Sequence, residues 1–155
     1  MQEIHIIIDR NVIEEYYKEY FFLYPKRKVR KIHSPIPPSL NELLTANRHA
    51  GNSIKHAWGE LGEWMIKKNN LQDMNIKKCF IAVDYTFPTR KLRDLDNASL
   101  KGYFDSFVST HFLSDDNFFV IQSLSFTGIY EKGVAKTVIT VRYEEEQNNN
   151  ESKNI

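Results

Sequence analysis

Acidic side chains gather at two places in this sequence. Asp94 and Asp96 lie two residues apart, and Asp115 and Asp116 are adjacent further along the chain. If residues 94–96 are extended, side chains two residues apart project from the same face, so the first pair would converge on one ion. Mg²⁺ and Mn²⁺ take oxygen ligands, including those of phosphate groups. The pattern therefore indicates a divalent-metal site, and phosphodiester hydrolysis is the reaction that such a site suits best.

Two other interpretations fit these residue types. Asp and Asn are common at turns and helix starts, where their side-chain oxygens accept backbone N–H groups, and this interpretation stays open. An EF-hand loop that begins at Asp94 is the second. It fails because Ala98 and Ser99 occupy the fifth and sixth positions, which require an oxygen ligand and a glycine.

A longer pattern surrounds the acidic pairs. Its parts, in chain order, are Pro35-Ile36-Pro37-Pro38-Ser39-Leu40-Asn41, Asp94-Leu95-Asp96-Asn97, Lys101, Asp105 and Asp115-Asp116. In these parts the sequence resembles the RusA family of Holliday junction resolvases, which are small phage and bacterial endonucleases. The resemblance covers residues 28–143, and it departs from the family at Lys101, which lies one residue further from Asp96 than the family usually places its lysine.

The resemblance implies an endodeoxyribonuclease that resolves four-way DNA junctions by paired nicks in recombination and repair. It implies catalytic roles for Asp94, Asp96, Asp116 and Lys101, and Mg²⁺ or Mn²⁺ held by Asp94, Asp96 and Asp116 with Asp115 nearby. The implied partners are branched DNA and a second copy of the chain, with no membrane and no small-molecule substrate. The implied setting is the cytoplasm of a bacterial host, for a protein of phage or prophage origin. An inactive DNA-binding or scaffold protein and a flap or fork nuclease remain alternatives.

Composition limits the other possibilities. With 155 residues and 41% hydrophobic content, the chain is long enough for one domain with a sizeable core. Cys79 is the only cysteine, which excludes an internal disulfide and a cysteine-based zinc site and fits a reducing cytoplasm. The first residues do not resemble a signal peptide, and no apolar run has the length of a membrane span.

The net charge of +1 hides an uneven distribution. Residues 143–155 contain four Glu and one Lys, so they carry −3 and the preceding residues carry +4. Basic residues concentrate at residues 26–31 and again just before Asp94. Cations beside a metal site hold the phosphate backbone of DNA, so the residues that we expect to bind DNA are Arg90, Lys91, Arg93, Lys28 and Arg30. The first cluster is equally compatible with a solvated surface.

Hydrophobic periodicity predicts an α+β fold, in which a mixed sheet is flanked by helices in a single domain. Residues 2–8 favour a strand and residues 12–24 an aromatic-rich helix capped by Asn11, which together form an N-terminal β–α extension over residues 1–27. The aromatic side chains of this helix are typical of a core or a subunit interface. A short strand is expected at residues 29–34, and apolar residues at helical spacing predict a helix over residues 54–65.

The second half of the chain should position the acidic motif. Residues 79–87 alternate with period two and predict a central strand. The motif at residues 94–97 then opens a helix, with Asp96 or Asn97 as its cap and with Asn97, Lys101 and Asp105 on one stripe. Residues 118–130 and 134–143 predict a hairpin. These elements complete a RusA-like nuclease domain over residues 28–143, and residues 144–155 are expected to form a disordered, acidic and Asn-rich tail.

Overall fold

Strand β2 (Cys79–Phe87) lies inside a four-stranded sheet, in the order β1-β4-β2-β3. The computed structural model, which describes residues 1–45 and 47–146, places β2 parallel to β3 (Ile121–Tyr130) and antiparallel to β4 (Lys136–Tyr143). Strand β1 (Gln2–Ile8) pairs with the other edge of β4. The period-two pattern is confirmed, because the alternate residues Cys79, Ile81, Val83 and Tyr85 are at most 2% exposed.

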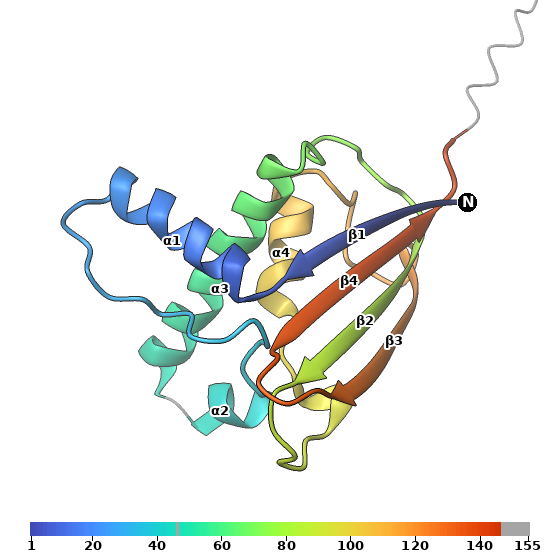
Figure 1. Cartoon of the computed structure of the whole chain (residues 1–155). Coiled ribbons are helices and arrows are strands. Elements are labelled where there is room, and N and C mark those ends of the chain that lie inside the picture. The colour runs from blue at the N-terminus through green and yellow to red at the C-terminus, as the bar shows by residue number, and fades with distance from the viewer. Residues whose placement is uncertain (46, 147–155) are drawn as a thin grey trace, which may run out of the picture.

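The helices all lie on one side of this sheet, so the fold has two layers (Figure 1). They are α1 (Arg10–Leu23), α2 (Leu40–Thr45), α3 (Arg48–Lys68) and α4 (Lys101–Ser109). The buried side chains of α1, α3 and α4 and one face of the sheet form one core, which includes Leu61, Phe107 and Ile139. This arrangement confirms the expected α+β class. In the described part of the chain, none of the helices is long and apolar enough to cross a membrane.

Helices α3 and α4 approach each other closely at Gly62. A Cβ atom at this position would overlap the Oγ atom of Ser106. Ser106 is 2% exposed and its hydroxyl donates a hydrogen bond of 2.6 Å to the carbonyl oxygen of Tyr103, so it has little room to move. The close contact fixes α4, which begins with Lys101, against the core.

The N-terminal strand and helix are built into the same sheet and core. Strand β1 pairs with β4 over its whole length, and Ile6 and Ile8 are 2% and 0% exposed. Helix α1 begins at Arg10, earlier than expected, because Asp9 rather than Asn11 caps it by accepting a backbone N–H group at 2.9 Å. Residues 147–155 of the predicted tail lie outside the described residues.

The strand expected over residues 29–34 is absent from the structure, whose described residues there form an irregular segment. The hydroxyl oxygen of Tyr17, a residue that is 3% exposed, accepts the backbone N–H groups of Lys31 at 3.0 Å and Ile32 at 2.8 Å. These two groups are therefore satisfied by a side chain, and they need no strand partner.

The predicted hairpin of β3 and β4 is wrong, because β2 lies between the two strands. Both strands form, but the turn that joins them crosses the end of β2. There the N–H of Glu131 donates to the carbonyl oxygen of Phe87 and the N–H of Gly133 to that of Pro88, both at 3.1 Å. The turn thereby fixes the start of the loop that leads to Asp94.

Candidate functional site

Backbone contacts join the proline-rich segment to the residues that follow the acidic motif. The N–H of Ser99 donates to the carbonyl oxygen of Pro38 at 2.8 Å, and Ser39 forms an isolated β-bridge with Ala98. The two separate parts of the sequence resemblance therefore lie side by side, which the sequence did not show.

These contacts also delay the start of α4. Residues Leu95–Asn97 form a short 3-10 turn, and the chain is extended at Ala98 before α4 begins at Lys101. The expectation that Asp96 or Asn97 caps this helix is wrong, since the position before it is Leu100, without a side-chain cap. For the same reason Asn97 does not share a helical stripe with Lys101.

Asp94 and Asp96 do not project from one face of an extended segment. Asp94 itself is extended, but Asp96 lies within the 3-10 turn of Leu95–Asn97, so the alternation of a strand does not relate the two side chains. Both residues are exposed. Asp94 lines a pocket of about 580 Å³ at the end of β2, together with Pro38, Phe87, Lys91, Arg93 and Asn97. Asp96 is not among the residues that line this pocket.

The second acidic pair divides into two different roles. The Asp116 carboxylate lies 3.2 Å from the ammonium group of Lys101, which is also 2.7 Å from the Asp105 carboxylate. Asp115 instead holds the turn, because its carboxylate accepts the backbone N–H of Asp116 at 2.7 Å and the side-chain amide of Asn117 at 2.9 Å. The structure thus pairs Lys101 with Asp116, and it gives Asp115 a local structural contact.

Lys101 keeps its positive charge near these carboxylates. Hydrogen bonds to Asp105 and Asp116 raise the pKa of the Lys101 ammonium group above its ordinary value. The side chain is 57% exposed, so water screens these attractions. Lys101 is therefore a cation at neutral pH, and it partly neutralises the charge of Asp116.

The donor types at this site suit Mg²⁺, but their positions do not form a closed shell. Carboxylate oxygens are the ligands that Mg²⁺ prefers. Within residues 1–45 and 47–146, no three His, Cys, Asp or Glu side chains are grouped closely enough to hold one ion. Asp94, Asp96 and Asp116 are therefore not gathered around one point, and the metal site stays a prediction.

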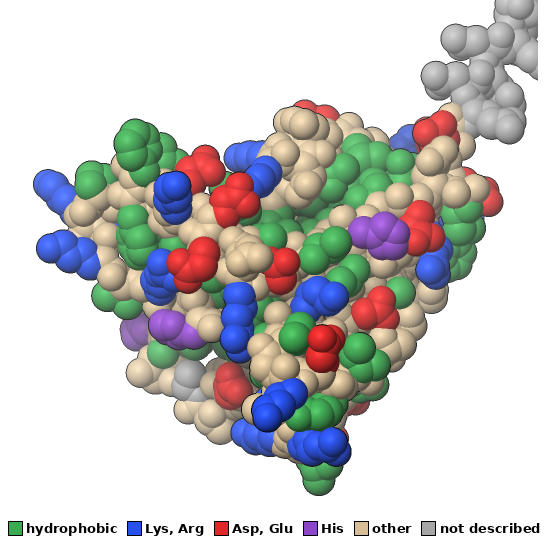
Figure 2. All heavy atoms as spheres, in the orientation of Figure 1, with side chains coloured by type: hydrophobic (Ala, Val, Ile, Leu, Met, Phe, Trp, Pro, Cys, Tyr) green, Lys and Arg blue, Asp and Glu red, His purple; other side chains and the backbone are tan. Residues whose placement is uncertain are grey.

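The basic residues before Asp94 form a loop supported by aromatic rings. The guanidinium group of Arg90 lies 4.6 Å from the ring centre of Tyr130, and that of Arg93 lies 4.9 Å from that of Phe87. Lys and Arg side chains gather on the surface at the lower end of the view in Figure 2, where Figure 1 places the loop after β2. The sequence identified these cations but not the rings that support them, because Tyr130 is distant along the chain.

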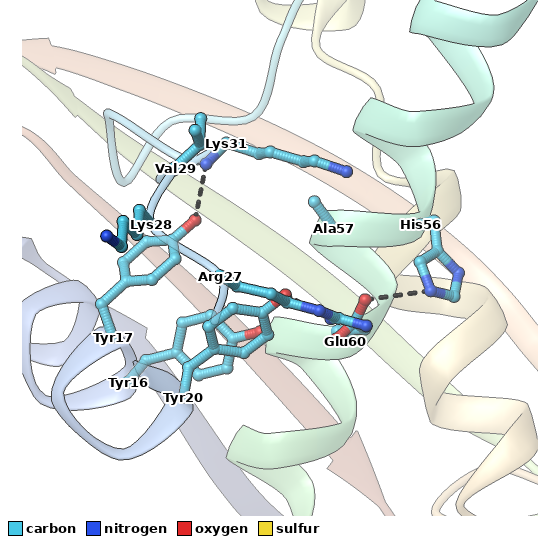
Figure 3. Close-up of a pocket in the computed structure, with 10 residues that line it drawn as sticks. All are labelled: Tyr16, Tyr17, Tyr20, Arg27, Lys28, Val29, Lys31, His56, Ala57 and Glu60. Carbon is cyan, nitrogen blue, oxygen red and sulfur yellow. Dashed lines mark hydrogen bonds and ion pairs between the residues drawn. The ribbon is translucent and has the colours of Figure 1, made fainter. Parts of the chain in front are cut away.

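The first basic cluster lies beside a second pocket, of about 440 Å³, between α1 and α3 (Figure 3). Lys28 lines this pocket together with tyrosines of α1. Arg30 pairs with the Glu14 carboxylate and lies 5.2 Å from the ring centre of Tyr17. The charge of Arg30 is thus balanced by α1, whereas Figure 3 shows Arg27, another cation of the same cluster, reaching toward Glu60 of α3.

Comparison with known proteins adds no family assignment. A scan against models of protein families found no match, and a search of curated proteins found no significant match. The resemblance to the RusA family therefore rests on the residues quoted above and stays a prediction.

Proposed function

We propose that this protein is a divalent-metal-dependent endonuclease that acts on branched DNA, and on four-way junctions in particular. The observation that carries the proposal is the contact between the proline-rich segment and the residues after the acidic motif, through Pro38 and Ser99. These segments enclose a pocket that combines the carboxylate of Asp94 with the cations of Lys91 and Arg93. Such a pocket offers both metal ligands and groups that bind phosphate.

In this proposal Asp94, Asp96 and Asp116 supply the oxygen ligands. A divalent ion held by them would activate water and neutralise charge on the scissile phosphate. Lys101 places a positive charge where negative charge develops during the reaction. Because these three carboxylates do not surround one point and Lys101 pairs with Asp116, binding of an ion would require the side chains to move together and Asp116 to exchange its partner.

A catalytically inactive DNA-binding protein is the second candidate, and a specific observation favours it. Lys101 bridges Asp105 and Asp116, so a lysine ammonium group already lies beside the Asp116 carboxylate. A protein of this kind would keep the cationic loop at Arg90 and Lys91 for binding, but it would have no use for free carboxylates beside it.

The proposed working unit is a dimer. A four-way junction must be cut on two strands of like polarity, and one chain carries one candidate site. An isologous dimer presents two identical sites to a nearly symmetric substrate. On a supercoiled plasmid with a cruciform, such a dimer should yield mainly linear product at limiting enzyme.

The decisive experiment is cleavage of three labelled DNA substrates of equal length: a four-way junction, a flap and a linear duplex. Each is incubated with Mg²⁺, with Mn²⁺ or with a chelator, and sedimentation gives the oligomeric state. Paired cleavage of the junction, only with metal, supports the proposal. Preferential cleavage of the flap by a monomer identifies a flap or fork nuclease. Tight junction binding with no cleavage under either metal identifies the inactive DNA-binding protein.

A further inference from the structure

The loop between β2 and the acidic motif carries a large apolar side chain, that of Leu92, which the core does not bury. Leu92 is 96% exposed, the highest value among the large hydrophobic residues in the described part of the chain. A single exposed leucine is common on protein surfaces and needs a second observation before it means anything. Here the second observation is the sequence around Leu92. Lys91 and Arg93 are adjacent to it in the chain, Arg90 is two residues before it and Asp94 two residues after it.

Internal contacts hold this loop in shape. The Arg93 guanidinium group donates to the Thr89 side-chain oxygen at 3.2 Å and to the carbonyl oxygen of Lys91 at 3.3 Å. The same group covers the ring of Phe87. Arg93 thus covers part of the nearby apolar surface, and Leu92 stays exposed at the rim of the pocket that Asp94 also lines.

The positive charges around Leu92 favour a polyanion as the binding partner of this loop. Arg90, Lys91 and Arg93 lie within two positions of it, and Leu92 lines the pocket at the end of β2 together with Lys91, Arg93 and Asp94. Proteins that deform DNA combine these two features, because cations fix the phosphates while an apolar wedge enters between bases. Separating bases is least costly where stacking is already interrupted, as it is at a branch point.

We infer that Leu92 is a wedge that enters the stack at the branch point of DNA, while Arg90 and Lys91 contact the flanking phosphates. This inference rests on the proposed function, and it deepens that function by naming the feature of the substrate that is recognised. Leu92 would select branched over linear DNA by its side chain, whereas the cations would bind both.

Fluorescence of 2-aminopurine tests this inference without relying on cleavage. The base analogue is placed at the branch point of a four-way junction, and the full-length protein is added in the presence of a chelator. Binding of the wild-type protein should increase the fluorescence, since an unstacked analogue is less quenched. The Leu92→Ala variant should lose this increase at saturating protein. Its affinity for the junction should fall about fiftyfold, as expected for the loss of three buried carbons, and its affinity for linear duplex should stay unchanged.

The matched control is Leu23→Ala, which truncates an exposed leucine at the end of α1. It should behave as the wild type in both assays. A normal fluorescence increase with Leu92→Ala would overturn the wedge, and so would an equal loss of junction and duplex affinity. Neither result would affect the nuclease proposal, which the cleavage assay tests separately. If Leu92→Ala instead weakened binding to anionic lipid vesicles and left both DNA measurements unchanged, the loop would be a membrane contact and the inference would be wrong.

Discussion

The ammonium group of Lys101 lies 3.2 Å from the carboxylate of Asp116, which links the first residue of α4 to the turn that follows this helix. A second carboxylate, that of Asp105, lies 2.7 Å from the same ammonium group. One cation therefore serves two acidic side chains at the surface. This ion pair decides whether Asp116 is available to a metal ion, so it is the natural first target for mutation.

Lys101→Met should abolish DNA cleavage while changing the free energy of unfolding by less than about 1 kcal/mol, because exposed ion pairs contribute little. In the wild-type protein the pKa of Lys101 is raised in the folded state. The stability that its pairs with Asp105 and Asp116 contribute is therefore fully present below the ordinary pKa of lysine, and it is lost only as the pH rises through the folded pKa. Because this fully present contribution comes from an exposed pair and is small, urea unfolding at pH 7 should show little difference between Lys101→Met and Lys67→Met, an exposed control on α3. Full cleavage by Lys101→Met would remove Lys101 from the mechanism.

Asp96→Asn should eliminate cleavage and preserve both the fold and the affinity for junction DNA. The substitution removes a ligand charge but keeps the shape of an exposed side chain in the 3-10 turn. Asp73→Asn is the control, since Asp73 is an exposed residue with φ of 63°, a conformation that Asn adopts readily. Gel-shift titrations and cleavage assays should be run in parallel. Wild-type turnover by Asp96→Asn would refute its role as a metal ligand.

Periodicity identified the elements of this fold better than it identified their neighbours. The strand over residues 79–87 follows from its alternating side chains, which the sheet buries on one face. The same kind of pattern could not show that β2 inserts between β3 and β4, because alternation determines which face a residue occupies and not which strand lies beside it. The short connection at residues 131–133 favoured a hairpin, but it hydrogen-bonds to the end of β2 instead.

The candidate site illustrates the same limit at the scale of single residues. The Asp and Lys residues were visible as a pattern, but their directions depend on the contact between Ser99 and Pro38, which are distant in sequence. That contact accompanies an extended chain at Ala98, where a helix was expected, so α4 begins only at Lys101, whereas the relative orientation of Asp94 and Asp96 depends on the 3-10 turn of Leu95–Asn97. The pairing of Lys101 with Asp116 likewise depends on how the chain returns after α4.

Replacing Arg90, Lys91 and Arg93 together by Gln should weaken binding to all DNA sequences alike. Each phosphate contact that is lost lowers the slope of log affinity against log salt by about 1. The matched control replaces three exposed lysines elsewhere, Lys18, Lys67 and Lys78, and it removes the same net charge. Fluorescence anisotropy across a salt series measures both slopes. Equal slopes for the two triple variants would mean that the loop contributes only general charge.

Gly62→Ala should destabilise the protein, whereas Gly59→Ala should not. A Cβ atom at Gly62 would overlap the buried Ser106 hydroxyl, but one at Gly59 would meet its nearest neighbour, the carbonyl oxygen of Gly102, at 3.7 Å, an ordinary contact. Overpacking of this kind costs about 1–3 kcal/mol, while Ala in an open helical position gains about 0.5–1 kcal/mol over Gly. Urea unfolding should therefore move the two midpoints in opposite directions. A stabilised Gly62→Ala variant would show that α3 and α4 are not in close contact there.

Tyr17→Phe should destabilise the fold and loosen the basic segment that begins at Lys28. The Tyr17 hydroxyl oxygen accepts two backbone N–H groups, from Lys31 and Ile32, and Ile32 is only 1% exposed. Removing the acceptor leaves these donors without their partner, which costs about 1–3 kcal/mol.

The control is Tyr24→Phe, because Tyr24 is 45% exposed and its ring remains available to Arg27 after the change. Urea unfolding should show the loss for Tyr17→Phe alone, and hydrogen exchange should show faster exchange of the Lys31 and Ile32 amides.

Deleting residues 1–27 should unfold the protein, because the deletion removes the Tyr17 contacts and the buried side chains of Ile6 and Ile8. A separate assembly module, in contrast, could be removed without loss of the core. Cooperative unfolding of the deleted protein at an unchanged urea midpoint would contradict this, and it would show that residues 28–143 fold on their own.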